Sequence, residues 1–466
     1  MGLLLRALTF IKFTFKGKVL RKIRDNNLFI MVNVFLKMVS LNFETGDYVK
    51  IRLALEEIEG RILECSETGI YLIKLNNGYN IGINKDNILA GRVLKKFKEE
   101  ENKEINFGKK EGLPSVGMIV TGGTIASKVD GKTGGVKPIK DIADFNRNYP
   151  EMFNIVNVSK LEIPFMILSE NMNSVHWKKI AEIAEKMLND SSISGVIITH
   201  GTDTLHYTSA ALSFFLRNLN KPVVLTYSQR SIDRGSSDAN LNLECAAKMA
   251  ISDCAEVIIV GHANINDEHC FAYRGTKVRK LHTSRRDAFN AINSKPLARI
   301  TKDKVEFLEE RRPRNNDQVE LDFEYNDKVA LVKYYPGQEA SILDYYALKY
   351  KGIVIEGTGF GHVAGSEADN NWVGKLKKHI REGLVVCMTT QCIYGKTDGY
   401  VYSIGRELME AGVIYLGDML SETAFVKLSW ILGHHGWKSH VKLKMFENFA
   451  GELNERLGLE KDEKTN

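Results

Sequence analysis

Hydrophobic and polar residues alternate in short runs between residues 41 and 90, and Gly and Asn separate the runs. The runs are Asp47–Arg52, Gly60–Cys65, Ile70–Leu75 and Asn80–Ile83. Alternation with a period of two predicts antiparallel strands, because successive side chains of a strand point to opposite faces. A segment of this length and pattern predicts a small all-β barrel, an interaction module without a catalytic cluster of its own.

Beyond Pro114 the pattern changes to an aliphatic run, a glycine turn and an amphipathic helix, repeated along the chain. Continuous aliphatic runs are typical of parallel strands that are buried on both faces. These runs are Val116–Val120, Gly195–Thr199, Pro222–Thr226 and Val257–Val260, with helices predicted at Val175–Leu188 and Thr204–Leu219. A second set predicts a smaller lobe, with strands at Val329–Tyr334, Gly352–Ile355 and Leu384–Met388 and helices at Asn370–Glu382 and Ile404–Ala411. The predicted fold class is therefore α/β: a two-lobed parallel-sheet core preceded by a small all-β barrel domain.

These patterns divide the chain into six segments. Residues 1–40 form a basic extension that is either disordered or not translated, since Met31 or Met38 could be the true start. The other segments are a small β-barrel at 41–94, a charged linker at 95–114, an α/β domain with the catalytic site at 115–324, a smaller α/β domain at 325–440 and a charged tail at 441–466.

The charge distribution limits the possible partners. The chain of 466 residues has a formal net charge of +6, and residues 1–38 alone hold eight basic side chains and one acidic one. The rest is close to neutral, which excludes the global basic face of an autonomous nucleic-acid binder, so any nucleic acid is expected to belong to a partner. No apolar run approaches the roughly 18 residues that span a bilayer. The basic and apolar residues 1–38 are also compatible with a targeting segment or a membrane-surface helix, but we expect no membrane partner.

The cysteines and histidines do not predict a metal site. Six cysteines are scattered without a C-x-x-C pair, which disfavours both a zinc site and a disulfide scaffold. The histidines lack metal-ligand spacing with cysteines or carboxylates. We therefore expect a metal-free protein of the reducing cytoplasm.

Two turns that directly follow predicted strands present side chains suited to catalysis. The first is Thr121–Ala126, with two glycines and two hydroxyls, and the second is His200–Thr204, with Thr202 and Asp203 side by side. Functional groups of open α/β sheets collect at such carboxyl ends of strands. A glycine turn alone is equally compatible with a structural role, and Thr or Asp at a helix start is ordinarily an N-cap. The adjacency of a hydroxyl and a carboxylate shifts this balance towards catalysis.

A lysine that could complete such a site lies in the basic segment Arg274–Phe289. A threonine hydroxyl is a poor nucleophile until a base removes its proton, and Asp203 together with a lysine could organise that transfer. Composition does not choose Lys280 over its neighbours. On its own, the segment is also typical of a solvated cationic loop or an RNA contact.

Together these residues resemble a known family. Thr121–Ala126 and His200–Thr204, in this order, match the two signature motifs of type I and type II L-asparaginases, and the resemblance covers residues 114–435. The chain is more similar still to the archaeal-type glutamyl-tRNA(Gln) amidotransferase D subunit, an asparaginase-like protein preceded by a small barrel. It shares with that family the sequence around Ser228–Ser231, Thr276–Phe289 and Gly417–Ala424. The barrel at 41–94 fits this family rather than a free asparaginase.

The resemblance implies a catalytic role for four residues. Thr124 corresponds to the nucleophilic threonine, and Thr202, Asp203 and Lys280 correspond to the second-motif triad. A neutral Lys280 could deprotonate a hydroxyl, but Asp203 beside it favours the charged form. Which group is the working base therefore stays open.

The resemblance also implies a substrate pocket. Ser169 and Glu170 lie in the segment that holds the α-carboxylate and the α-amine of the substrate, and Gly123 and Gly201 complete the predicted binding set. Backbone amides at the glycine turns could stabilise the oxyanion. Many asparaginases carry a flap Tyr where Gly131 stands here, so either free-standing asparaginase activity is weak or another residue closes the site.

The function that the resemblance implies is that of a glutaminase subunit. It would hydrolyse glutamine or asparagine without a cofactor and pass ammonia to a tRNA-binding E-type partner, which would use ATP and Mg to amidate Glu-tRNA(Gln). The implied assembly is a homodimer within an α2β2 complex in the cytoplasm, with the tRNA bound mainly by the partner. A stand-alone cytosolic L-asparaginase is the main alternative. A non-catalytic scaffold, with Gly131 as a sign of a decayed site, is a third.

Overall fold

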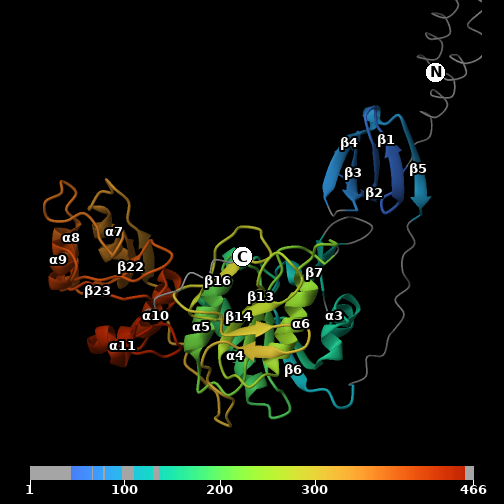
Figure 1. Cartoon of the computed structure of the whole chain (residues 1–466). Coiled ribbons are helices and arrows are strands. Elements are labelled where there is room, and N and C mark those ends of the chain that lie inside the picture. Colours follow the sequence, from blue (N-terminus) through green and yellow to red (C-terminus); the bar gives the residue numbers. More distant parts are fainter. Residues whose placement is uncertain are drawn as a thin grey trace, which may run out of the picture. The chain divides into compact units, whose positions relative to one another are not determined.

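The computed structural model describes residues 43–65, 67–76, 79–96, 110–129, 136–139, 141–232 and 234–456 (Figure 1). The predicted extension 1–40, most of the linker 95–114, Gly131 and the end of the tail 441–466 lie outside the described residues. The chain divides into two compact units, of which the first contains the N-terminal strands and the second contains the α/β core.

The N-terminal unit contains five antiparallel strands whose core consists of alternating aliphatic side chains. The strands are β1 (Tyr48–Arg52), β2 (Glu57–Leu63), β3 (Ile70–Leu75), β4 (Asn80–Asn84) and β5 (Ala90–Lys95), in the order β4-β3-β2-β1-β5, with the short 3-10 turn η1 (Lys85–Asn87) before β5. Val49 and Ile51 of β1 are fully buried and pack with Ile62 and Ile73 of the neighbouring strands. The predicted strand-rich domain that precedes the core is thus confirmed.

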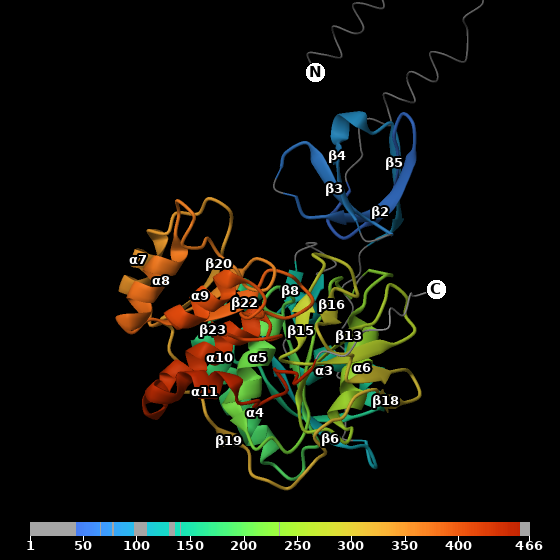
Figure 2. The same cartoon turned by 60° about the vertical axis from the view of Figure 1, so that its left-hand side comes forward.

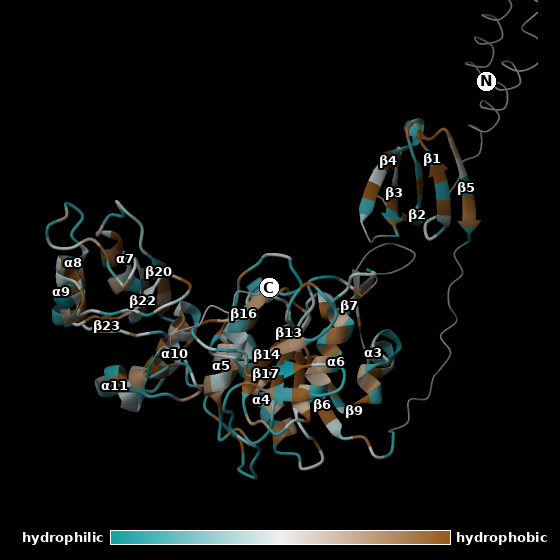
Figure 3. Cartoon of the chain, in the orientation of Figure 1, coloured by the Kyte–Doolittle hydropathy of each residue, from teal (hydrophilic) through white to brown (hydrophobic). Residues whose placement is uncertain are grey.

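The larger lobe of the core contains an eight-stranded mixed sheet in the order β18-β17-β14-β13-β12-β10-β6-β9. Its parallel part consists of β6 (Ser115–Val120), β9 (Asn157–Glu162), β10 (Val196–Thr199), β12 (Val223–Thr226) and β13 (Val257–His262). Its antiparallel part consists of β14 (Cys270–Arg274), β17 (Ala298–Ile300) and β18 (Val305–Phe307). Four of these parallel strands, β6, β10, β12 and β13, match the aliphatic runs of the sequence, whereas the edge strand β9 is partly exposed and polar and was not predicted. In Figure 3 the sheet is coloured mainly as hydrophobic.

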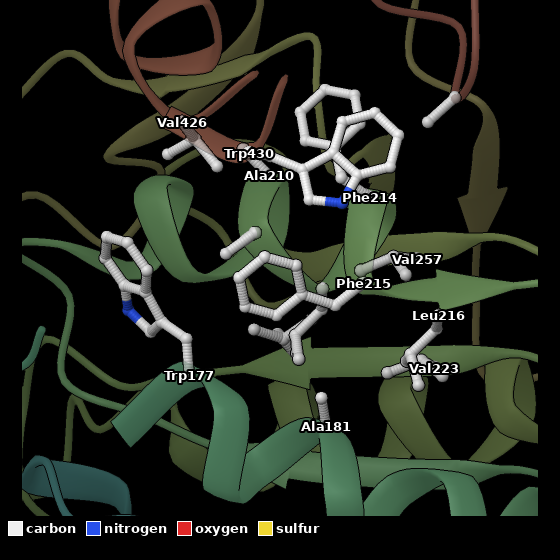
Figure 4. Close-up of a cluster of buried hydrophobic side chains, with 14 of the residues drawn as sticks. Trp177, Ala181, Ala210, Phe214, Phe215, Leu216, Val223, Val257, Val426 and Trp430 are labelled. Atoms are coloured by element: carbon white, nitrogen blue, oxygen red, sulfur yellow. The ribbon is translucent and has the colours of Figure 1, made fainter. Parts of the chain in front are cut away.

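Helices cover both faces of this sheet. One face packs against α4 (Ser174–Leu188) and α5 (Leu205–Phe215), and the other against α3 (Ile142–Asn148) and α6 (Ala239–Ala250). Trp177 and Ala181 of α4 and Phe214 and Phe215 of α5 belong to the first of these cores (Figure 4). Helix α5 was predicted to reach Leu219, but it ends at Phe215. The chain then forms the short strand β11 (Leu216–Arg217), which pairs with β19 (Glu320–Leu321).

Short elements connect the strands of the larger lobe. They are η2 (Thr124–Ala126), the paired β7 (Ser127–Val129) and β8 (Val136–Pro138), η3 (Met152–Asn154), η4 (Ser169–Asn171), and the paired β15 (Val278–Lys280) and β16 (Phe289–Ala291). Three of them, η2, η4 and β15, carry residues of the predicted site.

The smaller lobe contains a four-stranded parallel sheet. Its order is β20-β21-β22-β23, from strands at Val329–Lys333, Gly352–Gly357, Val385–Thr390 and Ile414–Tyr415. Helices α7 (Ile342–Lys349), α8 (Trp372–Arg381) and α9 (Ser403–Ala411) pack in one core with one face of this sheet. Helix α10 (Ser421–Gly433) packs on the other face of the sheet and also joins the core of the larger lobe. Figures 1 and 2 both place α10 beside α5, and Phe214 stacks on Trp430 with 5.5 Å between the ring centroids. The predicted two-lobed α/β core is thus confirmed, and α10 couples the two lobes.

The segment that follows α10 packs onto the core. It contains η5 (His435–His440) and α11 (Val441–Phe446), and Glu452 beyond them is fully buried. The Glu452 carboxylate pairs at 2.6 Å with Nζ of the fully buried Lys427, which also donates to the Met445 carbonyl oxygen. Residues 441–456 were predicted to be part of a charged tail, but in the structure they belong to the packed lobe. The burial of this segment was not predictable from the sequence, because a buried ion pair between charged residues gives no hydrophobic periodicity.

Candidate active site

The first motif forms a tight turn at the carboxyl end of β6. Thr121 is anchored to the next strand, because its Oγ1 donates to the Thr199 carbonyl oxygen at 2.8 Å. Gly122 and Gly123 follow with φ of +125° and +80°, a region that favours glycine. Thr124 then begins η2 with its side chain exposed. The turn thus presents the Thr124 hydroxyl at the edge of the sheet.

Glycines let this turn touch the other two turns of the predicted site. A Cβ at Gly123 would lie 2.7 Å from the backbone nitrogen of Gly201, and one at Gly122 would lie 2.5 Å from the Ile167 carbonyl oxygen. A Cβ at Gly201 would lie 2.9 Å from the Cβ of Ser169. The first motif therefore meets the second motif and the Ile167 backbone directly, and the second motif packs against the Ser169 side chain.

Lys280 joins the second motif from a distant segment. Its Nζ donates to Thr202 Oγ1 at 2.8 Å and to Asp203 Oδ1 at 2.7 Å. The Lys280 side chain is 11% exposed and that of Asp203 is 64% exposed, so the ion pair lies at the mouth of the site. The neighbouring Arg279 pairs instead with Glu422. The geometry therefore distinguishes Lys280 from its basic neighbours, which composition did not.

The second motif is not an ordinary helix cap. Helix α5 begins at Leu205, and its N-cap residue Thr204 makes no side-chain capping bond; its Oγ1 donates instead to the Ser169 carbonyl oxygen at 2.6 Å. The Asp203 carboxylate faces Lys280. The structure therefore does not support the interpretation of these polar residues as helix N-caps.

A buried histidine fixes the backbone of this motif. His200 Nδ1 donates to the Gly201 carbonyl oxygen at 2.6 Å, and its Nε2 accepts from Thr208 Oγ1 at 2.9 Å. Complete burial lowers the pKa of His200 to about 4, so the imidazole is neutral near pH 7. A neutral ring that satisfies both partners holds Gly201 where it touches Gly123.

The predicted substrate-binding residues lie on η4 and differ in exposure. Ser169 is 2% exposed, whereas Glu170 is exposed. The Ser169 side chain contacts the position that a Cβ of Gly201 would occupy. The structure thus brings Ser169 to the junction of the motifs and leaves the Glu170 carboxylate in solvent beside it. The flap position Gly131 lies outside the described residues.

Three charged or titratable residues next to this site, Arg279, His206 and Glu422, were not predicted from the sequence as part of it. Arg279 Nε lies 2.9 Å from Glu422 Oε1, and His206 Nε2 lies 3.9 Å from the same oxygen. Glu422 was noticed only within the shared segment Gly417–Ala424, and Arg279 only as part of a basic segment. A local sequence pattern could not have predicted this pair, because Arg279 lies on β15 of the larger lobe and Glu422 lies on α10.

Three family models match the chain in the order of its domains. The description "GatD N-terminal domain" matches residues 43–94, "Asparaginase, N-terminal" matches 115–313, and "Glutaminase/Asparaginase C-terminal domain" matches 328–446. No helix within the described ranges is long and apolar enough to cross a membrane.

Similar proteins cover nearly the whole chain. The glutamyl-tRNA(Gln) amidotransferase D subunit of Thermococcus kodakarensis is 47% identical over 88% of this chain and 94% of its own length. The corresponding D subunit of Pyrococcus abyssi is 48% identical over 91% of this chain and 97% of its own length. Among solved structures, the thermostable L-asparaginase from Thermococcus kodakarensis superimposes with a TM-score of 0.66 at 31% identity, covering 73% of this chain and 100% of that chain. With a matching N-terminal domain as well as the two asparaginase-type domains, the chain belongs to the family of glutamyl-tRNA(Gln) amidotransferase D subunits.

Proposed function

We propose that the chain is the glutamine amidohydrolase subunit of a tRNA-dependent amidotransferase. It would release ammonia from glutamine, and a partner subunit would use that ammonia and ATP to convert Glu-tRNA(Gln) to Gln-tRNA(Gln). The observation that carries the proposal is the meeting of the Thr124 turn with the Thr202–Asp203–Lys280 group in a chain that also has a GatD-type N-terminal domain.

In the first half of the reaction the Thr124 hydroxyl would attack the side-chain amide carbon of glutamine. The hydroxyl proton would pass through the Thr202–Lys280 hydrogen bond and then to the departing nitrogen, so that ammonia leaves and a threonyl ester remains. Asp203 would hold Lys280 towards Thr202 and balance its charge when it is protonated. Water would then hydrolyse the ester to glutamate and restore Thr124.

The neighbouring turns would hold the substrate for this attack. The Ser169 hydroxyl would bind the α-carboxylate, and the exposed Glu170 carboxylate would pair with the α-ammonium group. The glycine turns at Gly123 and Gly201 leave no room for side chains, so backbone amides there could approach the developing oxyanion. These residues need no metal or cofactor for amide hydrolysis.

The assembly belongs to the same proposal. The partner would be an E-type protein that binds most of the Glu-tRNA(Gln) and holds ATP and Mg, within an α2β2 complex built on a homodimer of this chain in the cytoplasm. The N-terminal β domain supports a role beyond hydrolysis. The solved L-asparaginase aligns over its full length but covers only 73% of this chain, so this chain has residues that the asparaginase lacks.

Ammonia release from glutamine and asparagine tests the proposal. The chain would be assayed alone and with the E-type partner, Glu-tRNA(Gln) and ATP. Strong stimulation by the complete system that disappears in Thr124→Ala is the expected result. High asparagine turnover that ignores the partner would favour a stand-alone L-asparaginase, which the fold likeness makes the second candidate. No turnover under any condition would favour a scaffold.

A further inference from the structure

The strand that carries Lys280 is also held from its other side by the smaller lobe. Arg279 and Lys280 are consecutive residues of β15, and consecutive side chains of a strand point to opposite faces. Lys280 reaches Thr202 and Asp203, whereas Arg279 Nε binds Glu422 Oε1 at 2.9 Å. Glu422 lies in the first turn of α10, so it comes from the other lobe.

Other contacts dock the same hairpin on the smaller lobe. Lys277, just before β15, pairs at 2.5 Å with Asp418, and both side chains are almost fully buried. Asn293, just after β16, exchanges two hydrogen bonds with the backbone of Gly395, at 2.8 Å and 2.9 Å. The hairpin position is therefore set by both lobes. Among these contacts, the Arg279–Glu422 pair is nearest to Lys280 in the chain, because Arg279 is the residue next to it.

The Glu422 carboxylate lies in a confined and charged environment. Glu422 is 5% exposed, and its second oxygen, Oε2, has no hydrogen-bond partner within the part of the chain that the structure describes. Burial raises the Glu422 pKa, the Arg279 charge lowers it, and Glu356 raises it further. His206 is buried as well, which lowers its pKa to about 3, so it is neutral and Arg279 is the cation that pairs with Glu422. A buried carboxylate whose cationic partner, Arg279, is the residue next to Lys280 links α10 to the site.

We propose that Glu422 is a positioning residue for amide hydrolysis. Its carboxylate holds Arg279 on the α10 side of β15 and so keeps Lys280 within hydrogen-bond distance of Thr202 and Asp203. The inference rests on the proposed function, and it assigns the smaller lobe a part in the geometry of the catalytic group.

The test compares two identical chemical changes in the smaller lobe. Glu422→Gln removes the charge that holds Arg279. Glu452→Gln is the matched control, because it also converts a buried carboxylate paired with a cation, Lys427, but at a contact that does not involve β15. Both variants are expected to unfold at lower temperature. Only Glu422→Gln is expected to lower kcat for ammonia release, on the order of ten-fold. KM should stay nearly unchanged, because Ser169 is contacted by Thr204 and Gly201, whereas Lys280 binds Thr202 and Asp203.

Two further readouts separate positioning from general destabilisation. Arg279→Gln should reproduce the loss in kcat, and the Arg279→Gln/Glu422→Gln double variant should be no slower than the slower single variant, because both changes break one contact. In Glu422→Gln the pH dependence of ammonia release should move to lower pH, because the Arg279 charge is no longer balanced by a carboxylate and adds a positive charge beside Lys280. The other titratable groups that face this pair are Asp203, Glu356 and Tyr207.

The outcomes are distinct. Wild-type kcat and pH profile in folded Glu422→Gln, or an equal kcat loss in Glu452→Gln, would overturn the inference. If Glu422→Gln does not fold, Arg279→Gln decides, because the Arg279 side chain is 28% exposed and Glu422, whose pKa is already raised by burial, can take up a proton once the cation is gone. Turnover that survives Thr124→Ala would overturn the proposed function itself, whichever result Glu422→Gln gives.

Discussion

Replacement of Gly123 by alanine tests the contact between the two signature motifs. The new Cβ would lie 2.7 Å from three backbone atoms, the nitrogen of Gly201 and the carbonyl carbon and oxygen of His200. Backbone atoms of a buried loop cannot rotate away as a side chain can. To reach an ordinary contact of about 3.4 Å, the two turns must separate by roughly 0.7 Å. Gly123 also has φ of +80° and ψ of 168°, a region essentially restricted to glycine, where a residue with a Cβ is strained by about 1 kcal/mol or more.

The two costs predict different effects on stability and on activity. Strain and displacement together should lower the free energy of unfolding by about 1–3 kcal/mol, so the protein still folds. A displacement of this size between Thr124 and the Thr202–Lys280 pair should lower kcat/KM for ammonia release by about a hundred-fold. Ammonia release at a temperature well below the melting transition, normalised to folded protein, measures the second effect alone.

Gly235→Ala provides the control. A Cβ at Gly235 meets nothing within 4 Å, and its φ is outside the positive region. This variant should keep wild-type activity and stability. Wild-type ammonia release by Gly123→Ala, or an equal loss in both variants, would refute the conclusion that the contact aligns the catalytic groups.

Three further predictions follow from particular contacts. Asp203→Asn should lower kcat by at least about a hundred-fold while the melting temperature barely changes, because the Asp203 carboxylate holds Lys280 but is 64% exposed. Lys427→Met should lower the melting temperature by about 10 °C, because it leaves the Glu452 carboxylate buried without its cation. His200, whose folded pKa of about 4 lies below its ordinary value, contributes stability that is complete above pH 6.5 and is lost as the pH falls towards 4, as unfolding at pH 7 and pH 5 would measure.

Each of these predictions can fail separately. Full activity of Asp203→Asn would remove the carboxylate from the mechanism. A Lys427→Met variant as stable as the wild type would mean that the Glu452 carboxylate is satisfied without its cation. An NMR titration in which the His200 imidazole takes up a proton near pH 6.5 in the folded protein would contradict the effect of burial on its pKa.

The buried parallel strands and the motif turns could be predicted because their signals are local, whereas the partly exposed edge strand β9 could not. Val196–Thr199 is a buried aliphatic run that leads directly into a glycine turn, and both features are visible without tertiary contacts. The antiparallel strand β17 (Ala298–Ile300) was not predicted, because three residues of mixed polarity do not establish a period. The end of α5 at Phe215 was likewise missed, since Leu216 continues the apolar pattern while its backbone pairs with Leu321.

The candidate site was predictable only in part for the same reason. The turns at Thr124 and Thr202 follow strands and could be found from the sequence, whereas Lys280 had to be placed by resemblance. Its selection over Arg279 depends on strand alternation and on Glu422, a residue far away in the chain. A contact between two lobes produces no hydrophobic periodicity in either of the two segments that make it, so the sequence pattern cannot predict it.

The identity of the nucleophile is the most direct test of the account. The chain, in complex with its partner, would be treated with an electrophilic diazoketone analogue of glutamine, and the labelled peptide would be located by mass spectrometry. We predict a single adduct on Thr124, which is exposed at the start of η2, and its absence in Thr124→Ala. An adduct on Thr202 instead, or no adduct while ammonia release continues uninhibited, would contradict the assignment of Thr124 as the nucleophile.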